Sequence, residues 1–194
     1  MDRRELIIDA ALQVATTEGF GALSVRSVAA AAGIGPTTLR HYFPTQALLY
    51  EALSSRFVMR ALSDLDIADQ TRPPVERLHE CLIQFLPGTQ DVRLELFGWF
   101  EVHRHAVGPD ANEGARVLLQ AARRQSGETV RRWLDLLVEE GHTLTRDPDV
   151  IIQDFLALLA GLHMTMLIEI EQNRLPAAIE TLRWFSRQTI KSST

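Results

Sequence analysis

The amino-acid sequence predicts an all-α protein in which an N-terminal three-helix module is followed by a larger helical body. Two observations support this fold class. Apolar residues recur at three- and four-residue spacings along most of the chain, as they do on the buried face of an amphipathic helix. No segment alternates apolar and polar residues in the way that marks a half-buried strand. The length of 194 residues accommodates two compact units.

The first two expected helices lead into a glycine turn. The first ends before Gly19 and Gly21. Its inner face consists of apolar residues at helical spacing: Leu6, Ile7, Ala10, Ala11, Val14 and Ala15. The second helix is short, because the Ser24 hydroxyl can cap its first turn and Gly33 can supply the left-handed residue that ends it.

A third helix is expected over Thr37–Phe43, with Pro36 in its first turn, where a missing amide hydrogen costs nothing. Pro44 then ends it. Thr45 can cap a longer fourth helix, from Gln46 to about Leu65. The inner stripe expected for that helix is Leu48, Leu49, Ala52, Leu53 and Phe57.

Residues 67–74 lose the helical periodicity and carry a Thr-Arg-Pro-Pro run, which indicates a seam before the helices of the body. We place the N-terminal domain at residues 1–50 and the body at residues 51–194. The expected body helices are Val75–Leu86, Asp91–His105, Glu113–Gly141, Pro148–Asn173 and Pro176–Ile190. Ser126 and Gly127 mark a point where the third of these could break.

Composition restricts the functions open to the chain. A net charge of −5 is unlike that of a protein that coats nucleic acid regardless of sequence, so any contact with DNA must be local. The single cysteine, Cys81, has no Cys or His neighbour at metal-ligand spacing, so we expect a buried or idle thiol in a reducing compartment. The charged N-terminus lacks the apolar core of a secretory signal, and we expect a cytoplasmic protein. The uncharged stretch Phe155–Ile168 is shorter than the roughly 20 residues of a membrane span and is expected to be a buried helix.

The most informative segment is residues 24–49, SVRSVAAAAGIGPTTLRHYFPTQALL, whose core at about 24–43 has the outline of a helix-turn-helix. Such a motif lays its second helix in the major groove, so that helix needs an apolar back and a hydrogen-bonding front. Leu39 and Phe43 supply the back. The front consists of Pro36, Thr37, Thr38, Arg40, His41 and Tyr42. A plain helical hairpin with a solvated face shares this outline, and the density of donors and rings is what favours DNA binding.

The run GIGPTTLRHYFPTQALL resembles the signature of the TetR family of transcriptional regulators, and the resemblance extends over residues 5–53. In that signature a Gly-Val/Ile turn leads into Thr-Leu-Tyr-x-His/Tyr-Phe, then Pro-Ser-Lys and the leucines of the next helix. Further along, Glu139-Glu140-Gly141 and Ala160-Gly161-Leu162 look like turns and helix-packing sites of the family's bodies. The resemblance implies a dimer that binds a palindromic operator, that most often represses, and that a small-molecule effector releases. An activator role stays open.

The resemblance also implies roles for single residues by matched position. Base edges would be contacted by Arg26, Pro36, Thr37, Thr38 and His41, and phosphates by Ser24, Arg40, Tyr42 and Gln46. Arg40 replaces a common phosphate-binding Tyr and keeps that chemistry. Gln46 replaces a common Lys, so it donates only neutral hydrogen bonds, and the salt dependence of DNA binding should be shallower.

Aromatic and polar residues are mixed on the inward faces of the body helices, as they are in sites for drug-sized ligands. The expected effector pocket consists of Phe85, Trp99, His103, Trp133, Phe155, Leu159 and His163. Each of these fits an ordinary core position as well, and a buried histidine is more often satisfied by a backbone carbonyl than by a ligand. No cofactor, metal site or catalytic group is expected.

The apolar stretch 155–170 must be buried by another protein surface, because a helix that is apolar on nearly all sides is not stable when it is exposed to water. The resemblance implies that helices 148–173 and 176–190 pair with their mates in a homodimer. Two rivals remain. An enzyme lacks support, since there is no phosphate loop, nucleophile elbow or paired metal ligand, and Gly33-Ile34-Gly35 follows a helix rather than a strand. A ligand-binding protein that keeps this fold without contacting DNA would leave Arg26 and Arg40 unexplained.

Overall fold

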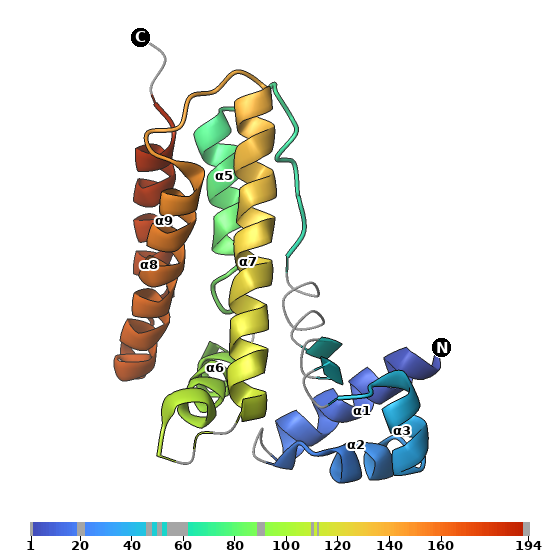
Figure 1. The fold of residues 1–194 in the computed structure, drawn as a ribbon. Coiled ribbons are helices and arrows are strands. Elements are labelled where there is room, and N and C mark those ends of the chain that lie inside the picture. Colours follow the sequence, from blue (N-terminus) through green and yellow to red (C-terminus); the bar gives the residue numbers. More distant parts are fainter. Residues whose placement is uncertain are drawn as a thin grey trace. The chain divides into compact units, whose positions relative to one another are not determined.

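A computed structural model describes residues 2–18, 22–45, 48–49, 52–53, 62–88, 92–109, 111 and 113–191 (Figure 1). Within these residues the regular structure is helical, apart from an isolated antiparallel bridge between Leu144 and Ile190. The all-α class predicted from the sequence is therefore confirmed. The chain forms two compact units, one of Met1–Arg60 and Phe97–Arg124, the other of Ala61–Leu96 and Gln125–Thr194.

The first unit contains α1 (Arg3–Thr17), α2 (Val25–Ala31) and α3 (Pro36–Tyr42). The predicted inner face of α1 is buried except for Leu6, which is half-buried. The shared core of this unit includes Ile7, Ala11, Val14, Val28, Leu39, Phe43, Leu53 and Leu118. Because α1 packs against α2 and α2 against α3, the three short helices form one rigid module around side chains that none of them could bury alone.

The fourth helix is described only in part. Residues 48–49 and 52–53 are helical, and the Thr45 hydroxyl accepts a hydrogen bond from the Leu48 amide at 3.2 Å, so the predicted cap is confirmed. Two expectations are wrong. Leu48 is 45% exposed rather than on the inner stripe, and the helix does not reach Leu65, because residues 62–64 are not helical and Leu65 has φ of +43°. Gln46 and Phe57 lie outside the described residues.

The second unit contains α5 (Pro74–Ile83), α8 (Pro148–Ile168), the 3-10 helix η2 (Ile170–Gln172) and α9 (Leu175–Thr189). The helices α6 (Val92–Val107) and α7 (Glu113–Glu139) each contribute residues to both units. The core of the second unit is built around Leu78, Leu82, Trp133, Leu134, Phe155 and Leu182. α9 packs against α5 and α8, and Figure 1 shows α8 and α9 side by side.

Two expectations about the body helices are corrected. α7 continues through Ser126 and Gly127 without a break, and a Cβ on Gly127 would lie 3.4 Å from the Ile152 side chain. The glycine therefore permits close packing of α7 and α8 and does not interrupt the helix. The helix expected to reach Asn173 ends at Ile168, and Asn173 adopts the left-handed conformation that follows η2.

α8 is also long and apolar enough, by length and composition alone, to cross a membrane, with a mean hydropathy of 1.7 over an 18-residue window. One side of α8 packs in the core through Ile151, Phe155, Leu159, His163 and Met166. A core helix of a soluble protein passes the same test of length and composition, so the hydropathy alone does not make α8 a membrane span.

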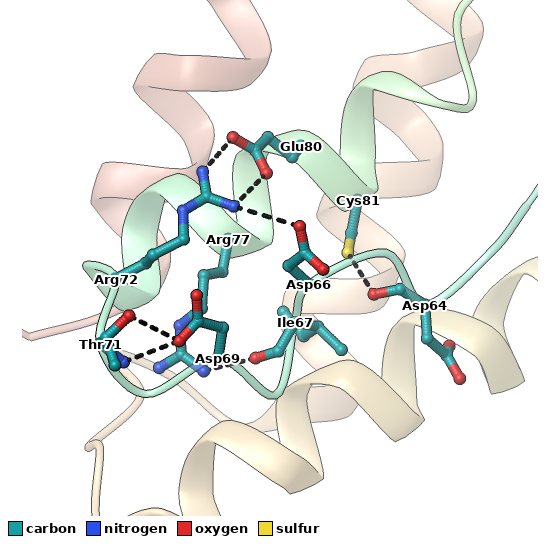
Figure 2. Close-up of polar contacts among 9 residues, drawn as sticks. All are labelled: Asp64, Asp66, Ile67, Asp69, Thr71, Arg72, Arg77, Glu80 and Cys81. Carbon is teal, nitrogen blue, oxygen red and sulfur yellow. Dashed lines mark hydrogen bonds and ion pairs between the residues drawn. The ribbon is translucent and has the colours of Figure 1, made fainter.

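A buried ion pair between Arg77 and Glu140, which the sequence did not reveal, fixes the segment before α5, and Figure 2 shows the contact of the same arginine with Ile67. Arg77 is only 1% exposed, and its guanidinium donates to Glu140 at 2.7 and 3.2 Å and to the Ile67 carbonyl. On the surface of the same segment, Arg72 pairs with Glu80. Although the loop at residues 67–74 is aperiodic, Ile67 is buried in the core of the second unit. The sequence separation of Arg77 and Glu140 explains why a local pattern could not predict their contact.

Candidate nucleic-acid interface

The start of α2 is fixed by a reciprocal pair of serines. The Ser24 hydroxyl accepts from the Ser27 amide at 3.0 Å, and the Ser27 hydroxyl accepts from the Ser24 amide at 2.9 Å. Ser27 Oγ also lies 2.6 Å from the Ala22 carbonyl, to which it donates. The predicted cap is therefore confirmed as a full capping box, which orients α2 relative to the chain before it.

The turn between α2 and α3 is a Schellman motif. The Gly33 amide donates to the Ala30 carbonyl at 3.1 Å, and the Ile34 amide donates to the Ala29 carbonyl at 3.0 Å. Gly33 has φ of +63°, a left-handed conformation that costs a side-chain-bearing residue about 1 kcal/mol. Gly35 then caps α3 in an extended conformation, with Pro36 in the first turn. The predicted use of both Gly33 and Pro36 is confirmed.

α3 has one buried face and one exposed face. Leu39 is fully buried and Phe43 is 2% exposed, so the predicted apolar back packs into the core of the module. The exposed residues are Arg26 on α2 and Pro36, Thr37, Arg40, His41 and Tyr42 on α3. Ser24 and Thr38 are half-buried. Apart from Gln46, which lies outside the described residues, the sequence-predicted DNA-contacting residues thus gather on two consecutive helices.

Contacts of the rings stiffen the end of α3. The His41 and Tyr42 rings meet edge to face, with their centroids 5.4 Å apart. The Arg4 guanidinium lies over the Phe43 ring, 5.2 Å from its centroid, which is within the range of a cation–π interaction. This contact holds the start of α1 beside the end of α3. Sequence reasoning missed Arg4, because only the folded module brings it to Phe43.

The residues predicted to line an effector pocket fall in both units. In the second unit the Phe85 ring lies 6.1 Å from Trp133 and 5.0 Å from Phe155, and the His163 Nε2 atom lies 3.1 Å from the Phe85 carbonyl oxygen. Leu159 is 9% exposed in the same core. These contacts form one cluster of packed rings, which we call the aromatic cluster: Phe85, Trp133 and Phe155.

Trp99 and His103 belong to the first unit and pair with each other on α6. Their ring centroids are 4.0 Å apart, and His103 Nδ1 lies 2.8 Å from the Trp99 carbonyl oxygen. Both histidines of the predicted pocket thus contact backbone carbonyls. An open pocket of about 210 Å³ in the second unit is lined instead by residues of the α8–α9 connection, Val92 and Met166.

Comparisons with known proteins agree with this architecture. Residues 7–53 match the family model described as bacterial regulatory proteins, tetR family. A curated relative, the HTH-type transcriptional regulator PksA of Bacillus subtilis (strain 168), is 31% identical over 106 residues, which are 54% of this chain. The chain covers 51% of that relative, about half of its length.

Solved structures share the fold over nearly the whole chain. A TetR-family transcriptional regulator from Rhodococcus sp. has a TM-score of 0.72 at 20% identity, covering 97% of this chain and 98% of its own. A transcriptional regulator from Saccharomonospora viridis, solved in complex with choline, has a TM-score of 0.62 at 20% identity, covering 97% and 98%.

A helix-turn-helix with a donor-rich exposed helix, joined to an all-helical body, defines the class of DNA-binding transcription regulators. Residues 7–53 of the chain match the tetR family of bacterial regulatory proteins, and the fold of nearly the whole chain is that of solved TetR-family structures.

Proposed function

We propose that this protein is a ligand-responsive repressor that binds a palindromic DNA operator as a homodimer and is released by a small-molecule effector. The observation that carries the proposal is the exposed face of α3. Thr37, an arginine, a histidine and a tyrosine are exposed, with the half-buried Thr38 beside them, on a helix whose start, turn and back are all fixed by the contacts described above. A rigid, donor-rich helix of this kind suits the major groove.

The net charge of −5 supports local binding, because attraction to DNA must come from the few cations near this face. In the proposed complex, Arg26, Pro36, Thr37, Thr38 and His41 contact base edges. Ser24, Arg40, Tyr42 and Gln46 contact phosphates. Ser24 does so in addition to its capping role.

For the effector, we propose a site in the second unit, lined by Leu159, His163 and the aromatic cluster. The packed rings of the second unit support it, since a mostly apolar site with few polar groups is typical for small molecules. The choline complex of the Saccharomonospora viridis regulator also supports a small-molecule ligand for this chain.

For the dimer, we propose that helices 148–173 and 176–190 pair with their mates. Support comes from large apolar side chains on the outer faces of α8 and α9: Met164 is 38% exposed, Trp184 56% and Ile168 74%. Small exposed residues earlier on α8, including Ala157, Ala160 and Gly161, would let a partner helix approach closely. Such a regulator works in the cytoplasm, where its DNA is.

The proposal is tested by passing genomic fragments over the purified protein, sequencing those retained, and measuring the affinity for the best fragment. Retention of a fragment with an inverted repeat, including one upstream of the protein's own gene, is the expected result. Effector control is tested by linkage: a compound that weakens DNA binding must itself bind the DNA complex more weakly by the same factor. Equal compound affinities with and without DNA would leave a DNA binder without ligand control, and no retained fragment would favour a ligand-binding protein that does not contact DNA.

A further inference from the structure

The segment that enters the second unit is attached to two helices at adjacent points. The Ser63 amide donates to Gln84 Oε1 at 2.9 Å, and Gln84 Nε2 donates to the Ser63 carbonyl at 2.8 Å. Asp64 Oδ1 accepts from Trp133 Nε1 at 2.7 Å and from the Arg132 guanidinium at 2.5 Å. Gln84 caps the end of α5, whereas Arg132 and Trp133 lie on α7.

The residues next to these anchors form the aromatic cluster. Phe85 follows Gln84, and its ring meets Trp133 edge to face at 6.1 Å. Phe85 in turn meets Phe155 of α8 at 5.0 Å. Trp133 therefore has two roles at once, since its ring is part of the cluster and its indole N–H holds Asp64.

The hydrogen bond from Trp133 holds Asp64 more firmly than the ion pair between Arg132 and Asp64 does. The side chains of Arg132 and Asp64 are 56% and 55% exposed, so water screens their attraction and the pair contributes little. Trp133 is only 1% exposed, and a buried N–H without an acceptor is costly. The hydrogen bonds from Arg132 and Trp133 lower the pKa of Asp64, which therefore stays a carboxylate at neutral pH.

The backbone beside Asp64 is strained. Leu65 has φ of +43° although it carries a branched side chain, which is 52% exposed and therefore gains little from packing. Such a conformation persists only where the surroundings impose it. The Asp64 carbonyl accepts from the Ile67 amide at 3.1 Å. It also lies 3.5 Å from Cys81 Sγ, a contact that Figure 2 shows. These contacts, together with the bond to Trp133, hold the strained turn.

We propose that the Asp64–Trp133 hydrogen bond is a latch through which the aromatic cluster controls the segment that leads to the DNA-reading module. A rearrangement of the cluster that turns the Trp133 ring withdraws the indole N–H from Asp64, and the strained turn at Leu65 then relaxes. The chain passes from the first unit to the second between Arg60 and Ala61, so the released residues are the ones that follow this crossing. The regulatory use of the latch rests on the proposed function, whereas its mechanical coupling does not.

A double-mutant cycle tests the latch. Phe85→Leu disturbs the ring that contacts Trp133, and Asp64→Asn weakens the acceptor. Hydrogen exchange of the peptide spanning residues 62–67 is measured for both single variants and the double variant, after circular dichroism has shown that each is folded. We expect Phe85→Leu to speed exchange in this peptide by about tenfold in the parent and by clearly less in the Asp64→Asn background, where the bond is already weakened. Additive effects of the two substitutions would overturn the latch.

Matched control variants distinguish loss of the Asp64–Trp133 bond from a general destabilisation of the second unit. Asp66→Asn removes a carboxylate two residues away that pairs with Arg72 at 3.8 Å and not with α7, and it should leave exchange at residues 62–67 and the cycle unchanged. Trp133→Phe keeps a ring but removes the donor, so it should speed exchange at least as much as Asp64→Asn does. Equal exchange of this peptide in Trp133→Phe and the parent would contradict the proposal.

A second readout links the latch to DNA. If the parent protein retains a genomic fragment, the same cycle is repeated on the affinity for that fragment, and non-additivity of about three- to tenfold is expected. Additive affinities together with a coupled exchange cycle would overturn the regulatory use of the latch. If no fragment is retained, the proposed function fails while the exchange cycle still decides the coupling.

Discussion

The polar side chains of α3 are the ones whose removal should affect DNA recognition most directly. We expect Thr38→Ala and Arg40→Ala each to abolish operator binding at physiological salt. Losing one good contact weakens binding about ten- to hundredfold, and a dimer loses it twice. Anisotropy titrations on a retained fragment measure the affinity, and Arg146→Ala is the matched control, since Arg146 is 60% exposed in an ion pair with Asp154. Parent-like binding by both α3 variants would reject the assignment of the reading helix.

The buried pair of Arg77 and Glu140 should dominate the response of stability to single charge removals. Arg77→Met leaves Glu140, whose side chain is 8% exposed, without its partner, so we expect a loss of about 3–5 kcal/mol in urea unfolding. Arg72→Met breaks a partly exposed pair with Glu80 and should cost about 0–1 kcal/mol. Adding Glu140→Leu to Arg77→Met should recover part of the loss. Equal costs for the Arg72 and Arg77 substitutions would show that burial does not decide the outcome.

His79 should make stability depend on pH. It is 4% exposed, and burial followed by the charge of Arg183 lowers its pKa below 6.5. Below pH 6.5 the unfolded chain therefore binds the proton more readily than the folded one does. The contribution of neutral His79 is complete above that pH and decreases as the pH falls toward the folded pKa. Urea midpoints at pH 7.5 and 5.5 measure the loss, which His79→Leu should reduce, and an unchanged difference would assign the pH effect to other groups.

At the scale of single elements, the turn of the helix-turn-helix offers a clean comparison of two glycines. Gly33 has φ of +63° and Gly35 has φ of −73°, and a Cβ at either position would meet no atom within 4 Å. Gly33→Ala should therefore cost about 1 kcal/mol through backbone strain alone. Gly35→Ala should be close to neutral, because its conformation suits any residue. Thermal unfolding measures both, and equal effects would mean that the left-handed turn is not kept in solution.

Periodicity and capping residues were enough to predict the helices of the N-terminal module, because each stop signal there acts on its own neighbours. The longer elements were predicted less well. Hydrogen bonds from α5 and α7 to Ser63 and Asp64 oppose continuation of the fourth helix, and these partners are distant in sequence. Gly127 was expected to mark a break in α7, but the helix continues through it, and the absence of a side chain lets the Ile152 side chain pack closely against it. Errors of this kind arise wherever a tertiary contact overrides a local preference.

In the candidate site too, the sequence predicted the features that depend on neighbouring residues and missed those that depend on distant ones. The front of α3 was predictable from the sequence because exposure on a short helix follows directly from its periodicity. The attachment of Asp64 to Trp133 was not predictable, since it joins a loop to a helix that lies much later in the chain. The sequence indicated that Trp133 was an inward-facing aromatic residue, but it gave no sign of a partner for the indole N–H.

At the scale of the whole molecule, the outer faces of α8 and α9 should decide the assembly state. Ile168 is 74% exposed, and we expect Ile168→Glu to convert dimers to monomers in sedimentation, because a charge would be buried in each half of the interface. Val107→Glu on α6 changes a side chain that is 77% exposed and should leave the assembly unchanged. Dimers that persist in Ile168→Glu at micromolar concentration would place the interface elsewhere.

The bridge between Leu144 and Ile190 closes the α8–α9 hairpin at its base. The Thr145 amide donates to the Thr189 carbonyl at 2.9 Å, and the Lys191 amide donates to the Thr143 carbonyl at 2.8 Å. These bonds join the residue after α9 to the loop before α8, so neither helix can fray from this end without opening the other. The hairpin should therefore open as a single cooperative unit in native-state hydrogen exchange, with the amides of Thr145 and Lys191 reporting the same opening free energy.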